Sequence, residues 1–255
     1  QWGPEIGPIE DQQGASLQES FGDIDLTGLD RWSQMASTNA NRMISLGHFV
    51  SGNEFYWNRQ KRRHRIAVPG QPYFRRKLAV KTLRRNGIRV STGRSTQTAY
   101  AIMSKAGINL FSNRIGLLNY QHQFRRLLRD SMTAYTDGSL LDLPLRKFFE
   151  IPAAGTLLLC SPFDGFEHLG FSDGRNCIVV EPDSLPRVIA QVSRDPERFA
   201  KISNDGQRLV HELHSLEARG QQLRLCLDLI ARNCFGGSHW SHGRFVVKDT
   251  NAREK

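Results

Sequence analysis

The sequence has no aspartate or glutamate between residues 55 and 129, although 18 lysines and arginines fall in that block. Residues 1–54 carry eight acids and two bases, and residues 130–255 carry 17 acids and 15 bases. Because a solvated surface normally mixes the two signs, the block suggests a face for phosphate, whether nucleotide, nucleic acid or anionic lipid. A merely solvated, arginine-rich face explains the composition equally well.

Several other signals are missing. No stretch approaches 18 consecutive apolar residues, so a membrane-spanning helix is not expected. The chain lacks the motifs GxGxxG, GxxxxGK[ST], HExxH and GxSxG, so dinucleotide-binding, P-loop, zinc-peptidase and serine-hydrolase functions have no motif support. The four cysteines show no CxxC spacing, which favours free thiols in a reducing cytoplasm over a zinc site or a disulfide framework.

What is present is enough apolar sequence for a core and a regular alternation of short apolar runs with helical patterns. The 255 residues are 39% hydrophobic. Strands are expected at 64–70, 88–93, 107–112, 156–161 and 176–181, with helices after most of them and three more before residue 235. Continuous apolar strands between helices predict a Rossmann-like α/β fold, in which helices cover both faces of a parallel sheet.

In such sheets, ligands bind at the carboxyl ends of the strands. The first expected strand is followed by Gly70, and then by Arg75 and Arg76 at the start of a helix. A helix N-terminus with arginines is suited to bind an anion. The signal is weak, because a glycine followed by arginines is common.

The segment 137–155 is more specific. Asp142 precedes an expected helix and Glu150 lies within it, eight residues later, while Arg146 and Lys147 stand between them. Taken alone, this pattern also fits an ordinary exposed helix face.

The same region resembles the C-terminal half of GT-B glycosyltransferases, and most closely the group-1 type found in spore-maturation CgeB-like proteins. The likeness is strong over residues 137–220 and weaker from about residue 60 onward. The residues that match the family pattern are Phe149, Glu150, Pro152, Ala153, Gly155, Asp173, Gly174, Asn176, Cys177, Asp183, Asp195, Pro196, Glu197, Gly206, His214 and Arg219.

The resemblance implies a domain that binds the nucleotide diphosphate of a sugar donor. Glu150 matches the second acid of an E-x7-E arrangement and would contact the ribose, while Asp142, a shorter acid, stands at the first position. Arg146 and Lys147 would suit the diphosphate, together with Arg75. Glu167 or His168 would contact sugar hydroxyls, with an ordinary surface loop as the alternative.

The resemblance also implies catalysis without a metal or another cofactor, because fixed cations stabilise the diphosphate leaving group. The spacing Asp-x-Asp occurs at Asp23 and Asp25, in a leader where we expect no metal site. His214 and Arg219 are expected to hold the late helices to the core rather than to do chemistry.

These observations predict a glycosyltransferase, of which this chain is mainly the donor-binding domain. Residues 1–55 are expected to be a remnant of an N-terminal domain with a linker, 56–235 the nucleotide-sugar domain and 236–255 a flexible tail. The expected partners are a nucleotide sugar and a glycan, lipid or protein acceptor, with peripheral membrane contact at a cytoplasmic location and no specific nucleic acid. The alternative is a basic α/β module that binds nucleic acid or an anionic surface without catalysis.

Overall fold

The protein is described here from a computed structural model. The structure describes residues 43–52, 55, 64–70, 74–93, 99, 102, 103, 105–107, 114–138 and 143–251. Its strands are β1 (His64–Ala67), β2 (Val90–Ser91), β3 (Ser131–Thr136), β4 (Leu157–Cys160), β5 (Ile178–Val179), β6 (Phe235–Ser241) and β7 (Arg244–Asp249). Its longer helices are α3 (Phe74–Arg85), α5 (Arg114–Arg129), α6 (Lys147–Ala153), α7 (Leu185–Arg194), α8 (Pro196–Leu213) and α9 (Leu216–Ala231), and a short 3-10 helix, η3, spans Pro182–Ser184.

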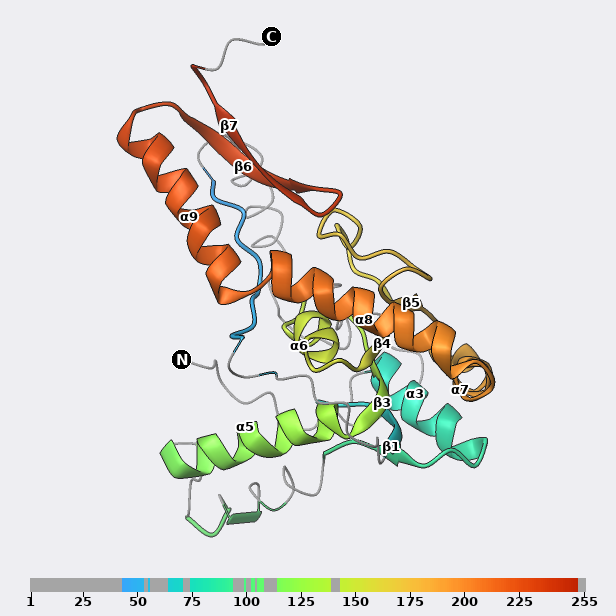
Figure 1. The fold of residues 1–255 in the computed structure, drawn as a ribbon. Coiled ribbons are helices and arrows are strands. Elements are labelled where there is room, and N and C mark those ends of the chain that lie inside the picture. Colours follow the sequence, from blue (N-terminus) through green and yellow to red (C-terminus); the bar gives the residue numbers. More distant parts are fainter. Residues whose placement is uncertain are drawn as a thin grey trace, which may run out of the picture.

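Five strands form one parallel sheet in the order β2-β1-β3-β4-β5, with helices around it (Figure 1). The strand order reverses between β1 and β3: the chain steps from β1 outward to β2, then returns across β1 to β3. The Rossmann-like architecture predicted from the sequence is thereby confirmed.

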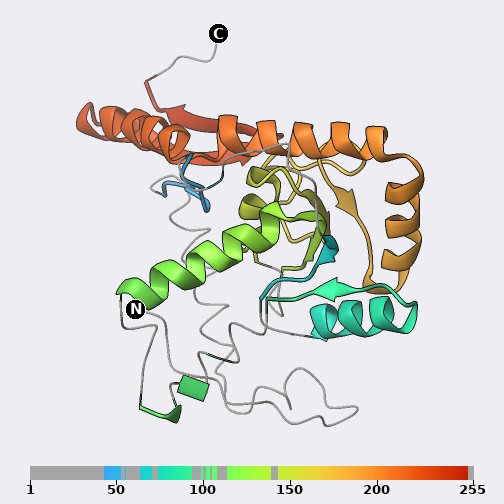
Figure 2. The same ribbon diagram turned by 60° about the horizontal axis from the view of Figure 1, so that its bottom comes forward.

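Side chains of the central strands alternate between two hydrophobic clusters. Ala134 and Leu158 belong to one cluster, while their neighbours Tyr135 and Leu159 belong to the other. The first cluster includes residues of α5, α6 and the second half of α8, and the second cluster includes residues of α3, α7 and the first half of α8. Helices cover both faces of the sheet (Figure 2), and the central strand β4 is therefore buried along its whole length, as is typical of a parallel sheet.

The central strand β3 and the helix α5 before it were not foreseen from the sequence. The sequence of β3 is partly polar, since it contains Ser131, Thr133 and Thr136. All three of these residues are fully buried in the structure. Two of their hydroxyls donate to backbone carbonyls: Thr133 to Arg65 at 2.8 Å and Ser131 to Leu127 at 2.7 Å. These hydrogen bonds offset the cost of burying the two hydroxyls. The sequence, however, has no apolar run at this position from which a strand could be predicted. The strand expected at 107–112 lies almost wholly outside the described residues.

The expected flexible tail from residue 236 is wrong. β6 and β7 pair as an antiparallel hairpin that packs on α9. Its turn is His242–Gly243, with φ of 47° and 77°, the positive values that a two-residue hairpin turn requires. Trp240 and Phe245 are cross-strand partners whose rings lie 5.4 Å apart. In the sequence, the signal was the pair Trp240 and Phe245 on either side of His242-Gly243.

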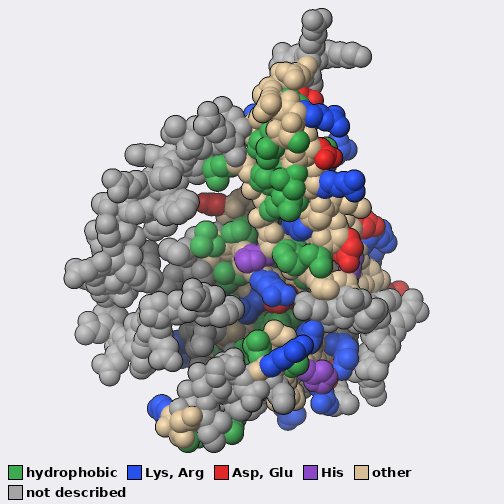
Figure 3. All heavy atoms as spheres, turned by 90° about the vertical axis from the view of Figure 1, so that its left-hand side faces the viewer, with side chains coloured by type: hydrophobic (Ala, Val, Ile, Leu, Met, Phe, Trp, Pro, Cys, Tyr) green, Lys and Arg blue, Asp and Glu red, His purple; other side chains and the backbone are tan. Residues whose placement is uncertain are grey.

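The segment 43–52 runs beside the α8–α9 junction and the hairpin. The amide of Val50 donates to the carbonyl of His214, and the amide of Ser238 donates to that of Met43. On the face shown in Figure 3, hydrophobic side chains gather over α9, which exposes Leu216, Leu223, Leu227 and Ile230. Among the described residues, no helix is long and apolar enough to cross a membrane.

Candidate functional site

The strand-order reversal defines where a ligand would bind. In open parallel sheets, the loops after the two strands at the reversal separate and leave a crevice at their carboxyl ends. Here these loops follow β1, with Pro69 and Gly70, and β3, with Asp137 and Gly138. The charged residues that line this crevice come from these loops or from the helices α3 and α6 that follow them.

A buried ion pair spans the crevice. Arg76, in the first turn of α3, donates from Nε to Oδ1 of Asp137 at 2.9 Å, and its Nη2 lies 2.9 Å from the same oxygen. Both side chains are almost inaccessible to water, at 2% and 1% exposure. Burial strengthens the attraction and makes the pair rigid, because breaking it would leave an uncompensated charge inside the protein.

A second cation, Lys147 at the start of α6, approaches the same place. A Cβ placed on Gly70 would lie 2.6 Å from Cε of Lys147 and 2.9 Å from Nη1 of Arg76. Gly70 also has a φ of 97°, so only glycine is comfortable there and leaves room for both cations. Burial first, and then the charge of Arg76, lower the pKa of Lys147, while Glu150 and Asp137 raise it by less.

Glu150 lies on α6 one turn beyond Arg146, as the sequence predicted. Nε of Arg146 is 3.0 Å from Oε1 of Glu150, and the two side chains are 50% and 12% exposed. The crevice therefore gathers three cations, Arg76, Arg146 and Lys147, against two carboxylates, Asp137 and Glu150. This excess of positive charge in a partly dehydrated place favours binding of an anion.

The aromatic residues of α6 connect this crevice with the turn after β4. The ring of Phe148 lies 4.7 Å from that of Phe163 and 6.0 Å from that of Phe166. The next ring, Phe149, contacts His48 at 6.2 Å and His214 at 5.0 Å. The short helix α6 thus holds Lys147, Glu150 and the turn after β4 in a fixed relation.

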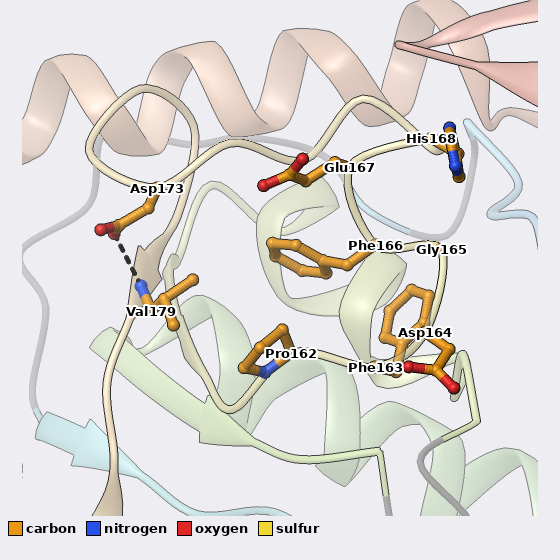
Figure 4. A pocket seen from close by; sticks show the side chains of 9 residues that line it. All are labelled: Pro162, Phe163, Asp164, Gly165, Phe166, Glu167, His168, Asp173 and Val179. Carbon is orange, nitrogen blue, oxygen red and sulfur yellow. Dashed lines mark hydrogen bonds between the residues drawn. The ribbon is translucent and has the colours of Figure 1, made fainter.

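The turn after β4 lines a hollow of about 480 Å³ (Figure 4). Figure 4 shows Glu167 and Phe166 over its middle, with His168 at its far rim. The ring of His168 lies 5.8 Å from that of His242 in the hairpin turn. The sequence suggested Glu167 or His168 as a contact of the sugar. In the structure the carboxylate of Glu167 extends over the hollow, whereas His168 lies at its rim (Figure 4).

The remaining residues that the sequence suggested lie outside this arrangement or outside the described residues. Arg75 lies half-buried in the first turn of α3, where its charge slightly offsets the burial that raises the pKa of Tyr135. Asp142 lies outside the described residues, as do Asp23 and Asp25. Within the described ranges, no three His, Cys, Asp or Glu side chains gather as a metal site would need. Sequence reasoning missed Asp137, since nothing local distinguishes it and its partner Arg76 is 61 residues away.

Comparison with known proteins gives the following. Residues 54–224 match the model of a family described as glycosyl transferase-like. No curated protein sequence matches the chain. The fold is similar to that of sucrose-phosphate synthase from Thermosynechococcus elongatus, with a TM-score of 0.51 and 14% identity, over 73% of this chain and 52% of that one.

A second solved structure is that of HepE from Anabaena in complex with UDP-glucose. It aligns with a TM-score of 0.44 and 14% identity, over 65% of this chain and 49% of that one. The chain thus spans about half the length of these solved structures.

Proposed function

The chain belongs to the glycosyl transferase-like family, and from that premise we propose that its described part binds the nucleotide diphosphate of a sugar donor. The observation that supports this most is the convergence of Arg76 and Lys147 on Gly70 at the strand-order reversal. Two cations that approach one glycine repel each other. A diphosphate in front of Gly70 would relieve that repulsion and accept hydrogen bonds from both.

The rest of the donor follows from this position. Glu150, held by Arg146, accepts hydrogen bonds from the ribose hydroxyls. Glu167 accepts hydrogen bonds from hydroxyls of the sugar, which lies toward the hollow after β4. Arg75 and Arg146 stand further out and contribute charge to the approach of the donor.

The chemistry is a transfer of the glycosyl group. The bond from the anomeric carbon to the diphosphate oxygen breaks, and a bond from that carbon to an acceptor hydroxyl oxygen forms. The acceptor hydroxyl loses its proton to a base, which we do not assign to this chain. The electron pair of the broken bond goes to the nucleotide diphosphate, and Arg76 and Lys147 stabilise the added negative charge in the transition state.

Finer features of the proposal rest on the sequence. We propose that the chain is a CgeB-like glycosyltransferase, and the residues around Glu150 and Arg219 that match that family's pattern support this. We propose a glycan, lipid or protein acceptor, bound largely by residues other than those described, and a donor site that works without a metal. The four cysteines are buried free thiols, which suits a cytoplasmic protein that touches a membrane only at its periphery.

Calorimetric titration with UDP, GDP and their glucose and mannose derivatives tests the proposal. We expect at least one nucleotide to bind, and the Lys147→Met variant to bind it on the order of tenfold more weakly, because a charge-assisted contact is lost. Lys201→Met removes an exposed lysine of α8 and is the matched control. If no nucleotide binds, or if both variants bind alike, the site is assigned wrongly. A steep loss of nucleic-acid binding with salt would favour the alternative basic module.

A further inference from the structure

Arg219 on α9 is a buried guanidinium whose five N–H groups all have acceptors. Its side chain is 4% exposed and lies over the ring of Trp240, 4.9 Å from the centroid. The acceptors are the carbonyls of Gly47 (3.1 Å), His48 (3.0 Å) and Leu213 (3.0 Å), Oε1 of Gln222 (2.6 Å) and Nδ1 of His214 (2.7 Å). With every donor used, the guanidinium has one orientation.

That orientation fixes the protonation of His214. A guanidinium can only donate, so Nδ1 of His214 must accept, and the ring proton sits on Nε2. Nε2 then donates to the carbonyl of Leu169 at 2.8 Å. Burial first, and then the charge of Arg219, lower the pKa of His214 to about 3, so the ring is neutral at physiological pH.

The imidazole also cannot turn away from this position. It is fully buried and lies 5.0 Å from Phe149 and 4.9 Å from Trp240, centroid to centroid. The ring of Phe171 lies parallel to it at 6.1 Å. Packing and hydrogen bonding therefore select the same single geometry.

Leu169 connects His214 with the turn that lines the hollow. Its amide donates to the carbonyl of Gly165 and so closes the turn that carries Glu167, while its carbonyl is bound to Nε2 of His214. The opposite end of the turn is fixed by Phe163 against Phe148. Glu167 is thus held by three anchors: Phe163 packs on α6, the carbonyl of His168 accepts from the amide of Gly243 at 2.9 Å, and Leu169 contacts the end of α8. Only the last of these anchors runs through His214.

We propose that His214 is a positioning residue, which transmits the fixed orientation of Arg219 to the Leu169 carbonyl and so holds Glu167 over the sugar of the donor. This rests on the proposed function, and it makes the Arg219–His214 pair a determinant of sugar binding rather than of diphosphate binding. The cations that hold the diphosphate, Arg76 and Lys147, are anchored separately, through Asp137 and Gly70.

The test uses the His214→Phe variant, which keeps an aromatic ring but leaves Leu169 and Arg219 without their partner. In the ligand-free protein, we expect amide hydrogen exchange to accelerate in the 163–170 turn and not in β3. In titrations, we expect affinity for UDP-glucose or GDP-mannose to fall on the order of tenfold, while affinity for UDP or GDP stays within about twofold. His214→Gln, whose amide can both accept and donate, is expected to restore most of the loss.

His211→Phe is the matched control, because His211 lies on α8, three residues before His214, and its Nε2 likewise lies close to a backbone carbonyl, that of Ala153 at 3.1 Å. It should change neither the exchange of the 163–170 turn nor the ratio of the two affinities. If His214→Phe does not fold, Arg219→Lys, which cannot serve five acceptors, takes its place. Unchanged exchange of the turn, or equal losses for nucleotide and nucleotide sugar, overturns the positioning role. Failure of the wild type to bind any nucleotide overturns the proposed function instead, and leaves the exchange result to decide on His214.

Discussion

Lys147 stands where the charge of the site is least balanced. Its ammonium approaches Gly70 beside the guanidinium of Arg76, whose own carboxylate partner, Asp137, is already engaged. Burial and the neighbouring charge lower the pKa of Lys147. A group whose pKa is lower in the folded than in the unfolded chain costs stability while it is charged in both states, and this cost disappears as the pH rises from the lowered pKa to the ordinary one.

The Lys147→Met variant should therefore be more stable than the wild type at pH 7 in the absence of ligand, by about 1 kcal/mol, even though it binds nucleotide more weakly. The difference should shrink as the pH approaches the ordinary lysine pKa of 10.5. Chemical denaturation of both proteins at pH 7 and pH 10 measures it, with Lys201→Met to correct for the loss of one ordinary surface charge. A Met variant that is less stable at pH 7 would mean that the cation is not strained in the folded state.

Individual site residues could be predicted from the sequence only where they belong to a recognisable local pattern. Glu150, Arg146 and Lys147 belong to one continuous segment, and the structure places all three on α6 or at its start. Asp137 directly follows a strand of partly polar residues. Its role depends on the ion pair with Arg76, which is distant in the sequence. Its role depends on the order of the strands, which no local pattern encodes.

Among the elements, those with clear apolar periodicity were foreseen and those with compensated polar burial were not. The expected strands at β1 and β4 and the helices α7 to α9 are present. β3 was not predicted because its buried residues are largely polar, and the hydroxyls of Ser131 and Thr133 donate to backbone carbonyls. The hairpin of β6 and β7 was not predicted because its glycines and histidines are also typical of flexible chain ends. In both cases, long-range contacts give structure to residues that are ambiguous by themselves.

The close approach of α8 to the loop before β5 depends on Gly206. A Cβ there would run into the carbonyl oxygen of Asn176, a residue that ties the loop together by donating to the carbonyl of Gly170 at 2.8 Å. Alanine normally stabilises a helix relative to glycine. In this position the steric conflict with a backbone atom outweighs that gain, because neither α8 nor the loop can move without disturbing the core.

We expect Gly206→Ala to destabilise the protein by about 2 kcal/mol, as overpacking does. Gly220→Ala on α9 is the matched control, since a Cβ there meets nothing within 4 Å. It should stabilise the protein by roughly 0.5–1 kcal/mol through helix propensity alone. Thermal unfolding of the two variants gives the comparison, and shifts of the same sign would show that α8 and the loop do not constrain each other.

At the scale of the molecule, the acid-free block divides into two kinds of base. Arg76 is buried and committed to Asp137, whereas Lys81, Arg84 and Arg85 are exposed along the solvent side of α3. Among the described bases of the block, Arg76 thus builds the crevice, whereas those exposed on α3 make the solvent side of that helix positive, which affects how anionic ligands and surfaces approach.

Arg219 joins parts of the chain that the sequence assigned to separate regions. It binds carbonyls of the 43–52 segment, the histidine at the end of α8 and the ring of Trp240 in the hairpin. Trp240 in turn donates from its indole nitrogen to the carbonyl of Ser45 at 2.9 Å. The segment 43–52, the late helices and the hairpin thus share one buried cluster, which is continuous with the core through His214 and Phe149.

Because of this sharing, the hairpin should unfold together with the sheet rather than fray before it. We expect Trp240→Ala to destabilise the whole protein by about 3 kcal/mol, since it removes a buried aromatic side chain and uncovers the Arg219 guanidinium. Its unfolding, followed by circular dichroism in urea, should remain a single transition with a lowered midpoint. His239→Ala, at the exposed neighbouring position of β6, should leave the midpoint unchanged. An unaltered midpoint in the Trp240 variant, or an early separate phase for the hairpin, would restore the view that residues 236–255 are a tail, because a tail contributes nothing to the stability of the sheet.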